Sequence, residues 1–316
     1  YFVKNETMGS FKKSVSDRKV LRYGENPHQK GVFYGALEKM FDQLNGKELS
    51  YNNLVDTDAA INLIQEFNET IAFGIIKHTN ACGISEGKTV KEAYERAFEA
   101  DTISPFGGIL VTNQIVEIDA AEAMHDLFFE ILIAPGYTDE ALELLSKKKN
   151  RIILRFLEDL RPAVEYKSLL NGVILQDRDK KTDLEEDLKI VTNAKPDKSQ
   201  VEDMLFASKI CKHIKSNAIV LVKGKQMLSC GVGQTSRVDA LKQAIEKADT
   251  FKLNLEGAVM ASDAFFPFKD SVEIAHRAGI KAIIQPGGSK RDSESVDYCN
   301  ENGLSMVFTG YRHFKH

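Results

Sequence analysis

The sequence predicts an α/β protein built from two three-layer units. Apolar, strand-like segments alternate with amphipathic, helix-like segments between about Val55 and Gln176, and a second alternating series follows Ser199. Such alternation is typical of proteins in which helices pack on a largely parallel sheet. The length of 316 residues also exceeds the usual size of one hydrophobic core, which favours two units.

In the first unit, apolar runs of strand length are separated by stretches whose apolar residues recur every three or four positions. The polar segment Ser50–Asn53 is interpreted as the entry turn of a helix that starts near Thr57. Strands are expected at Ile71–Ile76, Gly108–Val111, Ile131–Ala134, Ile152–Phe156 and Val173–Gln176. Helices are expected at Val90–Ala100, Ile118–Phe129 and Asp139–Lys147.

A charged segment, Asp177–Ser199, separates the two units and is interpreted as a linker or an exposed crossover. Ser199 and Glu202 have the spacing of a capping box, which predicts a helix over Val201–Ile214. The remaining elements are a hairpin of Ala218–Val222 and Met227–Gly231, helices at Ser236–Ala248, Asp270–Ala278 and Ser293–Asn300, and strands at Gly257–Ser262, Lys281–Ile284 and Leu304–Phe308.

The composition argues against several classes of protein. Hydrophobic residues make up 43% and charged residues 28%, and no apolar stretch approaches the ~20 residues that a membrane span needs. The net charge of −4 argues against a general nucleic-acid binder and favours small-molecule partners. The four cysteines show no CxxC spacing, and HxE and HExxH elements are missing, so we expect no zinc site and reduced thiols in the cytoplasm. The start at Tyr1 rather than Met leads us to expect a missing upstream part.

One segment joins a cation to an imidazole at the end of a predicted strand. Lys77 and His78 follow the apolar run Ile71–Ile76 and precede a helical stretch that begins near Thr89. Ligands of α/β proteins bind outside the carboxyl ends of the strands. A base with a pKa near neutrality and a fixed cation suit general base catalysis and the stabilisation of an anion. Taken alone, this pair is equally consistent with a solvent-exposed loop.

Several other polar segments have both a structural and a functional interpretation. The turn Arg22–Gln29 either caps the fold or uses Arg22 and Tyr23 to hold a phosphate or sugar. The pair Gly107–Gly108 permits a close approach of a ligand to the backbone. The segment Gly231–Arg237 lacks the Walker A and GxGxxG patterns, but amides at a helix start and Arg237 can bind an anion.

The end of the second unit carries three more such segments. Ala261–Asp270 contains three phenylalanines, which either fill the core or form a flat wall for an aromatic ring. Gln285–Ser289 ends the next strand in the same way. The terminal Arg312–His316 is either a frayed basic tail or a docked end that delivers Arg312.

Taken together, these segments resemble one family, the AICAR transformylase part of the PurH proteins of purine biosynthesis. The matching motifs are RYGENPHQ, LSYNN, KHxNxCG, FGG, IAP, SN, GxGQxSR, SDAFFPF and the terminal RHFxH, in this order from about Leu21 to His316. Two departures from the family pattern are Ala81 and Thr102, where the family commonly has Pro. Neither departure removes a side chain that does chemistry.

The resemblance implies a fold, a reaction and an assembly. The family fold is a pair of cytidine-deaminase-like α/β/α units with mixed sheets and without the deaminase zinc. The reaction is transfer of a formyl group from the co-substrate 10-formyltetrahydrofolate to the 5-amino group of AICAR, by a homodimer with shared sites. We expect residues 1–20 to end a linker from an absent IMP cyclohydrolase domain, with transformylase subdomains at 21–198 and 199–316.

The resemblance also implies roles for individual residues. His78 is the general base, Lys77 the electrostatic stabiliser and proton source, and Asn217 a donor to the carboxamide or the oxyanion. The residues expected to bind AICAR are Arg22, Tyr23, Gly107, Glu130, Arg237, Phe265 and Arg312. Folate is expected near Val238, Asp270 and Ser289. Two alternatives are a nucleoside-deaminase-like enzyme and a nucleotide-binding protein without catalysis.

Overall fold

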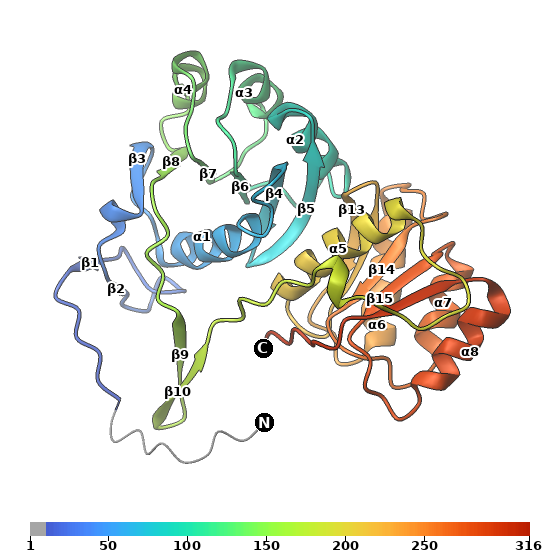
Figure 1. Cartoon of the computed structure of the whole chain (residues 1–316). Coiled ribbons are helices and arrows are strands. Elements are labelled where there is room, and N and C mark those ends of the chain that lie inside the picture. Colours follow the sequence, from blue (N-terminus) through green and yellow to red (C-terminus); the bar gives the residue numbers. More distant parts are fainter. Residues whose placement is uncertain (1–10) are drawn as a thin grey trace.

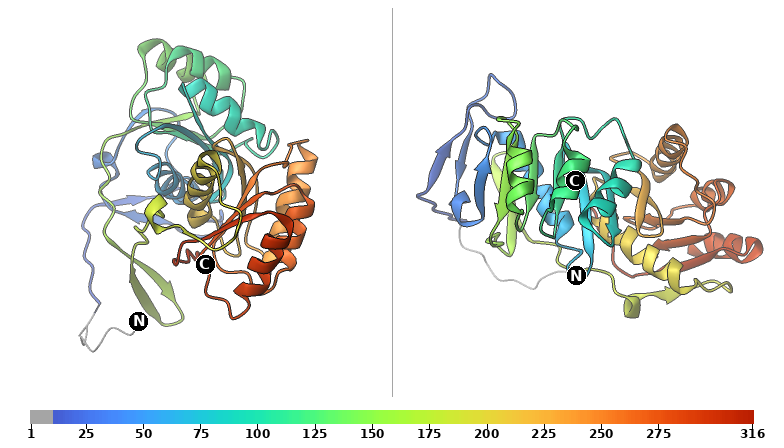
Figure 2. Two further views of the ribbon diagram at one scale, coloured as in Figure 1. Left: turned by 45° about the vertical axis from the view of Figure 1, so that its right-hand side comes forward. Right: turned by 90° about the horizontal axis from the view of Figure 1, so that it is seen from above.

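The computed structural model describes residues 11–316 and places a single twelve-stranded sheet through both halves of the chain (Figure 1). The strand order is β11-β16-β15-β14-β12-β13-β5-β4-β6-β7-β8-β3. The halves lie side by side in both views of Figure 2. They join where β13 pairs antiparallel with β5, with Gln226 opposite Ser85. The prediction of residues 1–20 as a linker falls partly outside the described residues.

The first half contains β3 and the strands and helices that follow it. The bounds are β3 Phe41–Asn45, α1 Tyr51–Ile64, β4 Ile71–Lys77, β5 Asn80–Gly87, α2 Val90–Glu99, β6 Ile109–Thr112, α3 Ile118–Met124, β7 Ile131–Ala134, α4 Asp139–Ser146 and β8 Ile152–Phe156. Strands β6, β7 and β8 are parallel, whereas β4 runs antiparallel to both β5 and β6.

The second half repeats this mixed arrangement. Its elements are β11 Lys189–Ile190, α5 Lys198–His213, β12 Ile219–Lys223, β13 Gln226–Gly231, α6 Arg237–Thr250, β14 Val259–Ser262, α7 Asp270–Arg277, β15 Ala282–Gln285, α8 Asp292–Asn302 and β16 Ser305–Phe308. Strands β14, β15 and β16 are parallel, and β12 is antiparallel to its two neighbours. The expectation of a largely parallel sheet is therefore wrong, whereas the mixed α/β class is confirmed.

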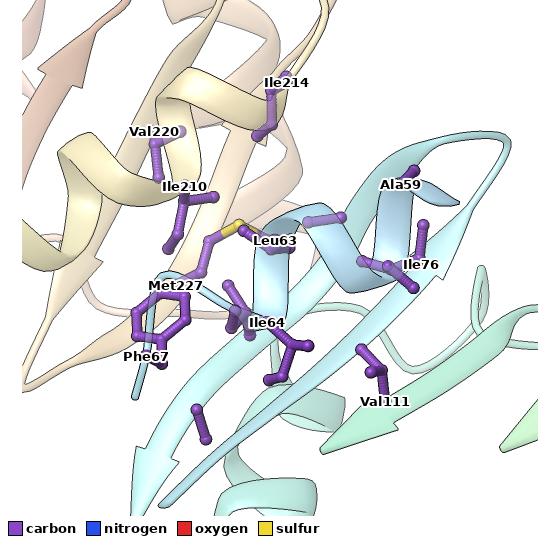
Figure 3. Close-up of a cluster of buried hydrophobic side chains, with 14 of the residues drawn as sticks. Ala59, Leu63, Ile64, Phe67, Ile76, Val111, Ile210, Ile214, Val220 and Met227 are labelled. Carbon is purple, nitrogen blue, oxygen red and sulfur yellow. The ribbon is translucent and has the colours of Figure 1, made fainter. Parts of the chain in front are cut away.

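Helices cover both faces of the sheet and produce three layers. On one face, α1 and α5 pack over the junction of the halves and share one core (Figure 3). In that core, Leu63, Ile64 and Phe67 lie beside Ile210 and Met227 of the other half. On the opposite face, α2, α3 and α4 cover the first half and α6, α7 and α8 cover the second. The shared core ties the two halves together.

Two short antiparallel pairs lie outside the large sheet. Strands β1 (Arg18–Val20) and β2 (Val32–Tyr34) form one pair, and a 3₁₀ turn at Leu37–Lys39 leads on to β3. Strands β9 (Val164–Leu169) and β10 (Gly172–Asp177) form an exposed ribbon that projects from the body (Figure 1). The predicted strand Val173–Gln176 exists, but it lies in this ribbon rather than in the sheet.

Local capping chemistry sets the start of two helices. Ser50 accepts a hydrogen bond from the Asn53 amide and the Asn53 side chain accepts one from Ser50 N, so α1 begins at Tyr51 and not near Thr57. For α5 the capping box is Asp197 with Gln200. The predicted box of Ser199 and Glu202 is wrong because Glu202 instead pairs with Lys225, at 2.9 Å.

Strand β5 was not predicted, although it lies near the centre of the sheet. Its sequence, NACGISEG, is rich in residues that strands disfavour. Gly83 is needed there, because a Cβ at this position would lie 1.8 Å from the carbonyl oxygen of Ala97 in α2. Ala81 is buried in this strand. Among the described residues, no helix combines the length and apolar character that crossing a membrane requires.

Candidate functional site

Lys77 and His78 lie at a tight turn between two central strands. Lys77 ends β4 and pairs with Asn80, the first residue of β5, so His78 and Thr79 alone form the turn. Their φ angles are 51° and 65°, as type I′ hairpin turns require. His78 is exposed and Lys77 half-buried. The expected strand end is confirmed, but the segment continues into β5 before the helix begins at Val90.

Three hydrogen bonds hold this turn. The Thr79 amide donates to Asp56 Oδ1 of α1 at 2.7 Å, and Asn80 Nδ2 donates to the His78 carbonyl at 2.9 Å. The Thr79 hydroxyl also donates to the His78 carbonyl, at 2.6 Å. Sequence reasoning missed Asp56, since no local pattern signals a contact with a turn 23 residues away.

Lys77 connects the turn to Gly107 and Glu130. Its Nζ donates to the Phe106 carbonyl at 2.8 Å, and the amides of Gly107 and Glu130 donate to Phe128 and Gly108. Gly107 has a φ of +75°, which favours glycine. The Glu130 carboxylate is 2.5 Å from Lys47 Nζ. Lys77 ends β4, whereas Gly107 and Glu130 lie just before β6 and β7. The expectation that site residues follow the carboxyl ends of strands is therefore met by Lys77 but not by these two residues.

The residues around Lys77 form one group of predicted site residues, and a second group lies in the other half of the chain. This second group lies just before β12 and just after β13 and β14. The amide and side-chain Nδ2 of Asn217 both donate to the Gln234 carbonyl, at 3.1 and 2.8 Å. Arg237 Nη2 lies 3.2 Å from Oδ1 of Asp263, whose side chain is fully buried. Asp263 lies in a segment singled out by sequence, yet only the fold revealed it as the partner of Arg237.

The C-terminal tail is docked against this second group. The His313 amide donates to the Asp263 carbonyl at 3.0 Å, and Ser216 and Lys315 exchange hydrogen bonds at 2.9 and 3.0 Å. The guanidinium groups of Arg312 and Arg237 lie 4.6 and 5.7 Å from the centre of the Phe314 ring. The interpretation as a frayed tail is therefore wrong.

Both groups belong to one edge of the sheet. The Lys215 amide approaches Asn80 Oδ1 at 3.5 Å, and the Cys230 thiol approaches the Ala81 carbonyl at 3.5 Å. Strand β5 begins and β13 ends at this same edge because the two strands are antiparallel. We call it the site edge; it comprises Lys77–Asn80, Gly107, Glu130, Ser216-Asn217, Gly231–Arg237, Asp263–Phe265 and Arg312–Lys315.

Arg22 and Tyr23 lie beyond the site edge, at the start of α1. Asn52 Nδ2 donates to the Glu25 carbonyl at 3.2 Å and ties their turn to the helix that carries Asp56. The Arg22 guanidinium is exposed and lies 5.6 Å from the centre of the Tyr23 ring. Among the described residues, neither side chain has a hydrogen bond to Lys77, His78 or Asn217.

The residues expected near folate follow strands of the second half or begin its helices. Val238 lies half-buried in the first turn of α6, and Asp270 is the exposed first residue of α7. Ser289 follows β15, and its hydroxyl accepts from the Arg291 amide at 3.1 Å. Of the three nearby phenylalanines, Phe266 is buried in the core, whereas Phe265 and Phe268 are exposed. Core filling is thus confirmed for Phe266 alone, and a wall for an aromatic ring stays a prediction for the two exposed rings.

Two groups beside the Lys77–Asn80 turn have shifted pKa values. Burial raises the pKa of Asp56, although the amides of Thr79 and His78 and the His78 imidazole lower it. Burial also raises the pKa of Cys82 to about 12, and all four cysteines are free and buried. Residues 11–316 hold no group of three or more His, Cys, Asp or Glu side chains arranged to bind a metal ion.

The fold and the site edge define the class of protein. It is a mixed three-layer α/β protein in which an imidazole, a lysine, an amide and arginines lie at one edge of the sheet. The sequence also matches the model of the AICARFT/IMPCHase bienzyme family over residues 1–247. The chain belongs to this family.

Individual relatives agree with the family match. The chain is 58% identical over 307 residues to the bifunctional purine biosynthesis protein PurH of Bacteroides thetaiotaomicron, a match that covers 97% of this chain and 60% of that protein. It is 50% identical over 301 residues to the protein of the same name from Aquifex aeolicus, covering 94% and 59%. The chain therefore spans about three fifths of the length of these relatives.

Proposed function

We propose that this chain transfers a formyl group from 10-formyltetrahydrofolate to the 5-amino group of AICAR, yielding FAICAR and tetrahydrofolate. The observation that carries the proposal is the shared sheet edge, on which the Lys77–His78 turn lies with Asn217, Arg237 and Arg312. A binding protein without catalysis has no need of the base and cation. Membership of the AICARFT/IMPCHase family supports the same reaction.

His78 is the general base of this reaction. The AICAR amine is a weak nucleophile because its lone pair is delocalised, so a proton must leave as the new N–C bond forms. Lys77 stabilises the oxyanion on the formyl carbon and supplies the proton that N10 takes up when the C–N10 bond breaks. Asn217 donates to the carboxamide or the oxyanion.

The remaining residues bind the two substrates. Arg22, Tyr23, Arg237 and Arg312 hold the ribose phosphate and nearby polar groups, since guanidinium groups donate paired hydrogen bonds to phosphate. Gly107, Glu130 and Phe265 frame the AICAR ring. The folate lies near Val238, Asp270 and Ser289.

The proposal extends to the assembly and the longer protein. Two chains form a homodimer with shared sites, in the cytoplasm, and subdomains 21–198 and 199–316 make up each transformylase. The name of the relatives describes them as bifunctional, and we infer that the full-length protein also has IMP cyclohydrolase activity.

The direct test measures FAICAR and tetrahydrofolate after the chain is mixed with AICAR and 10-formyltetrahydrofolate. Added cyclohydrolase converts FAICAR to IMP and guards against an unfavourable equilibrium. Formyl transfer without added metal supports the proposal. AICAR binding without any turnover would favour the non-catalytic alternative, and bound zinc with ammonia release would favour the deaminase alternative.

A further inference from the structure

The turn that carries His78 has a backbone that needs support. Both of its residues have positive φ, and neither is glycine. Thr79, at 65°, is β-branched, and β-branched side chains rarely occupy the left-handed region. Asn and Gly are the residues that usually stabilise such a turn. The surrounding structure must therefore hold this conformation.

Asp56 supplies that support from a separate, rigid element. Its Oδ1 accepts the Thr79 amide at 2.7 Å, which fixes the second residue of the turn. Helix α1 is anchored by its capping box and by its own buried face, which includes Thr57, Ala59 and Ala60. The carboxylate is thus held still on one side of the turn, while Asn80 holds the His78 carbonyl on the other side.

Within residues 11–316, the polar contacts of this carboxylate lie at the turn. Among residues 11–316, Asp56 has no ion pair within 4.0 Å to a lysine or arginine, although burial disfavours its charged form. The groups that favour the charged form are the Thr79 and His78 amides and the His78 imidazole. A carboxylate that makes its contacts at this turn is suited to positioning.

We propose that Asp56 is a positioning residue for His78, holding the His78–Thr79 turn in the left-handed conformation that points the imidazole at the substrate amine. This inference rests on the proposed formyl transfer. An imidazole displaced by ~1 Å loses much of its effect as a base, at a cost of up to roughly 100-fold in rate. Binding of AICAR by the arginines does not depend on the turn.

The experiment compares kcat and the KM for AICAR in wild type, Asp56→Ala, Thr79→Gly and the double variant, with Asp58→Ala as the matched control. Asp58 lies on the same helix and is exposed, and among the described residues its carboxylate pairs with Asn62 and Arg161. Asp56→Ala should lower kcat at least about tenfold and change KM by less than about threefold. Thr79→Gly favours positive φ without help, so adding it to Asp56→Ala should recover several-fold in kcat.

The outcomes separate this inference from the proposed function. A wild-type chain that forms no FAICAR would remove the function itself. If the wild type is active, either of two results would overturn the positioning role. The first is an Asp56→Ala variant whose kcat stays within about twofold of wild type, and the second is a double variant that is no faster than Asp56→Ala. If Asp56→Ala does not fold, Asp56→Glu, which keeps the charge and moves the carboxylate by one methylene, is judged by the same two criteria.

Discussion

The Nδ1 atom of His313 lies 2.6 Å from Oδ2 of Asp179, and this contact ties the C-terminal tail to the charged segment between the two halves. Asp183 approaches the other ring nitrogen at 3.7 Å and accepts a hydrogen bond from Ser208 at 2.5 Å. Because the His313 amide donates a hydrogen bond to the Asp263 carbonyl, the same residue also anchors the tail to the segment that follows β14. The tail is part of the fold.

This contact predicts a loss of stability at alkaline pH. Asp179 and Asp183 raise the pKa of His313 from 6.5 to about 9, against the effect of burial. A folded-state pKa above the unfolded value means that the contribution is complete below about pH 6.5 and is lost as the pH rises through about 9. The contribution is on the order of 3 kcal/mol. Urea unfolding at pH 6, 8 and 10 should show this loss for wild type and a flatter profile for His313→Gln.

His78→Ala should abolish most of the formyl transfer. Loss of a general base typically lowers kcat by roughly 10²- to 10⁴-fold. The proposed phosphate ligands are unchanged, so AICAR binding measured by calorimetry should stay close to wild type. His276→Ala, on α7 beside Tyr298, is the matched control and should keep full activity. Near-normal turnover of His78→Ala would remove the base assignment.

Lys77→Arg should also reduce turnover. The guanidinium keeps the charge, but it holds its protons more tightly and has a different shape from the ammonium that donates to the Phe106 carbonyl. We expect a loss of at least about tenfold in kcat. Lys88→Arg, at an exposed position before α2, serves as the control. Unchanged turnover of Lys77→Arg would make Lys77 only a structural cation.

Mixing two inactive variants should restore activity if the sites are shared between subunits. Among the hydrogen bonds and ion pairs of residues 11–316, none joins Arg22 to His78 within one chain, so His78→Ala and Arg22→Ala are suitable partners. Random exchange makes half of the dimers mixed, each with one intact site, which predicts recovery of about a quarter of wild-type activity. Exchange is verified with differently tagged chains. Exchanged dimers without recovery would indicate that each chain builds its site alone.

Gly83→Ala should destabilise the fold strongly. The new Cβ would meet the Ala97 carbonyl oxygen at 1.8 Å, where α2 packs on β5. Overpacking of this kind costs typically 1 to 3 kcal/mol. Gly172→Ala is the control, because no atom lies within 4 Å of a Cβ built there, and its effect should stay within about 0.5 kcal/mol. Urea unfolding of the two variants measures the difference.

Local sequence predicted the elements whose signals are local. Helices α2, α4 and α6 begin at or within one residue of the expected positions, because apolar periodicity and caps such as Thr89 and Ser236 act within one turn. Strand β5 could not be predicted from local sequence, because Gly83 and its polar neighbours disfavour strands. Gly83 is required there only because α2 packs closely on the strand. The predicted start of α5 is wrong because the sequence offers two overlapping capping boxes, Asp197 with Gln200 and Ser199 with Glu202. Only the tertiary structure distinguishes them, since it pairs Glu202 with Lys225.

The same division applies to the site. The sequence by itself determined which side chains are candidates, from motifs such as Lys77-His78 and from family resemblance, and their catalytic and binding roles stay predictions. Only the tertiary structure decided that most of them share one sheet edge, that Asp56 and Asp263 belong with them, and that the tail is docked. The physical reason is that strand pairing brings together residues far apart in the chain. The antiparallel joining of β5 and β13 aligns the ends of strands from both halves, and no local pattern encodes that pairing.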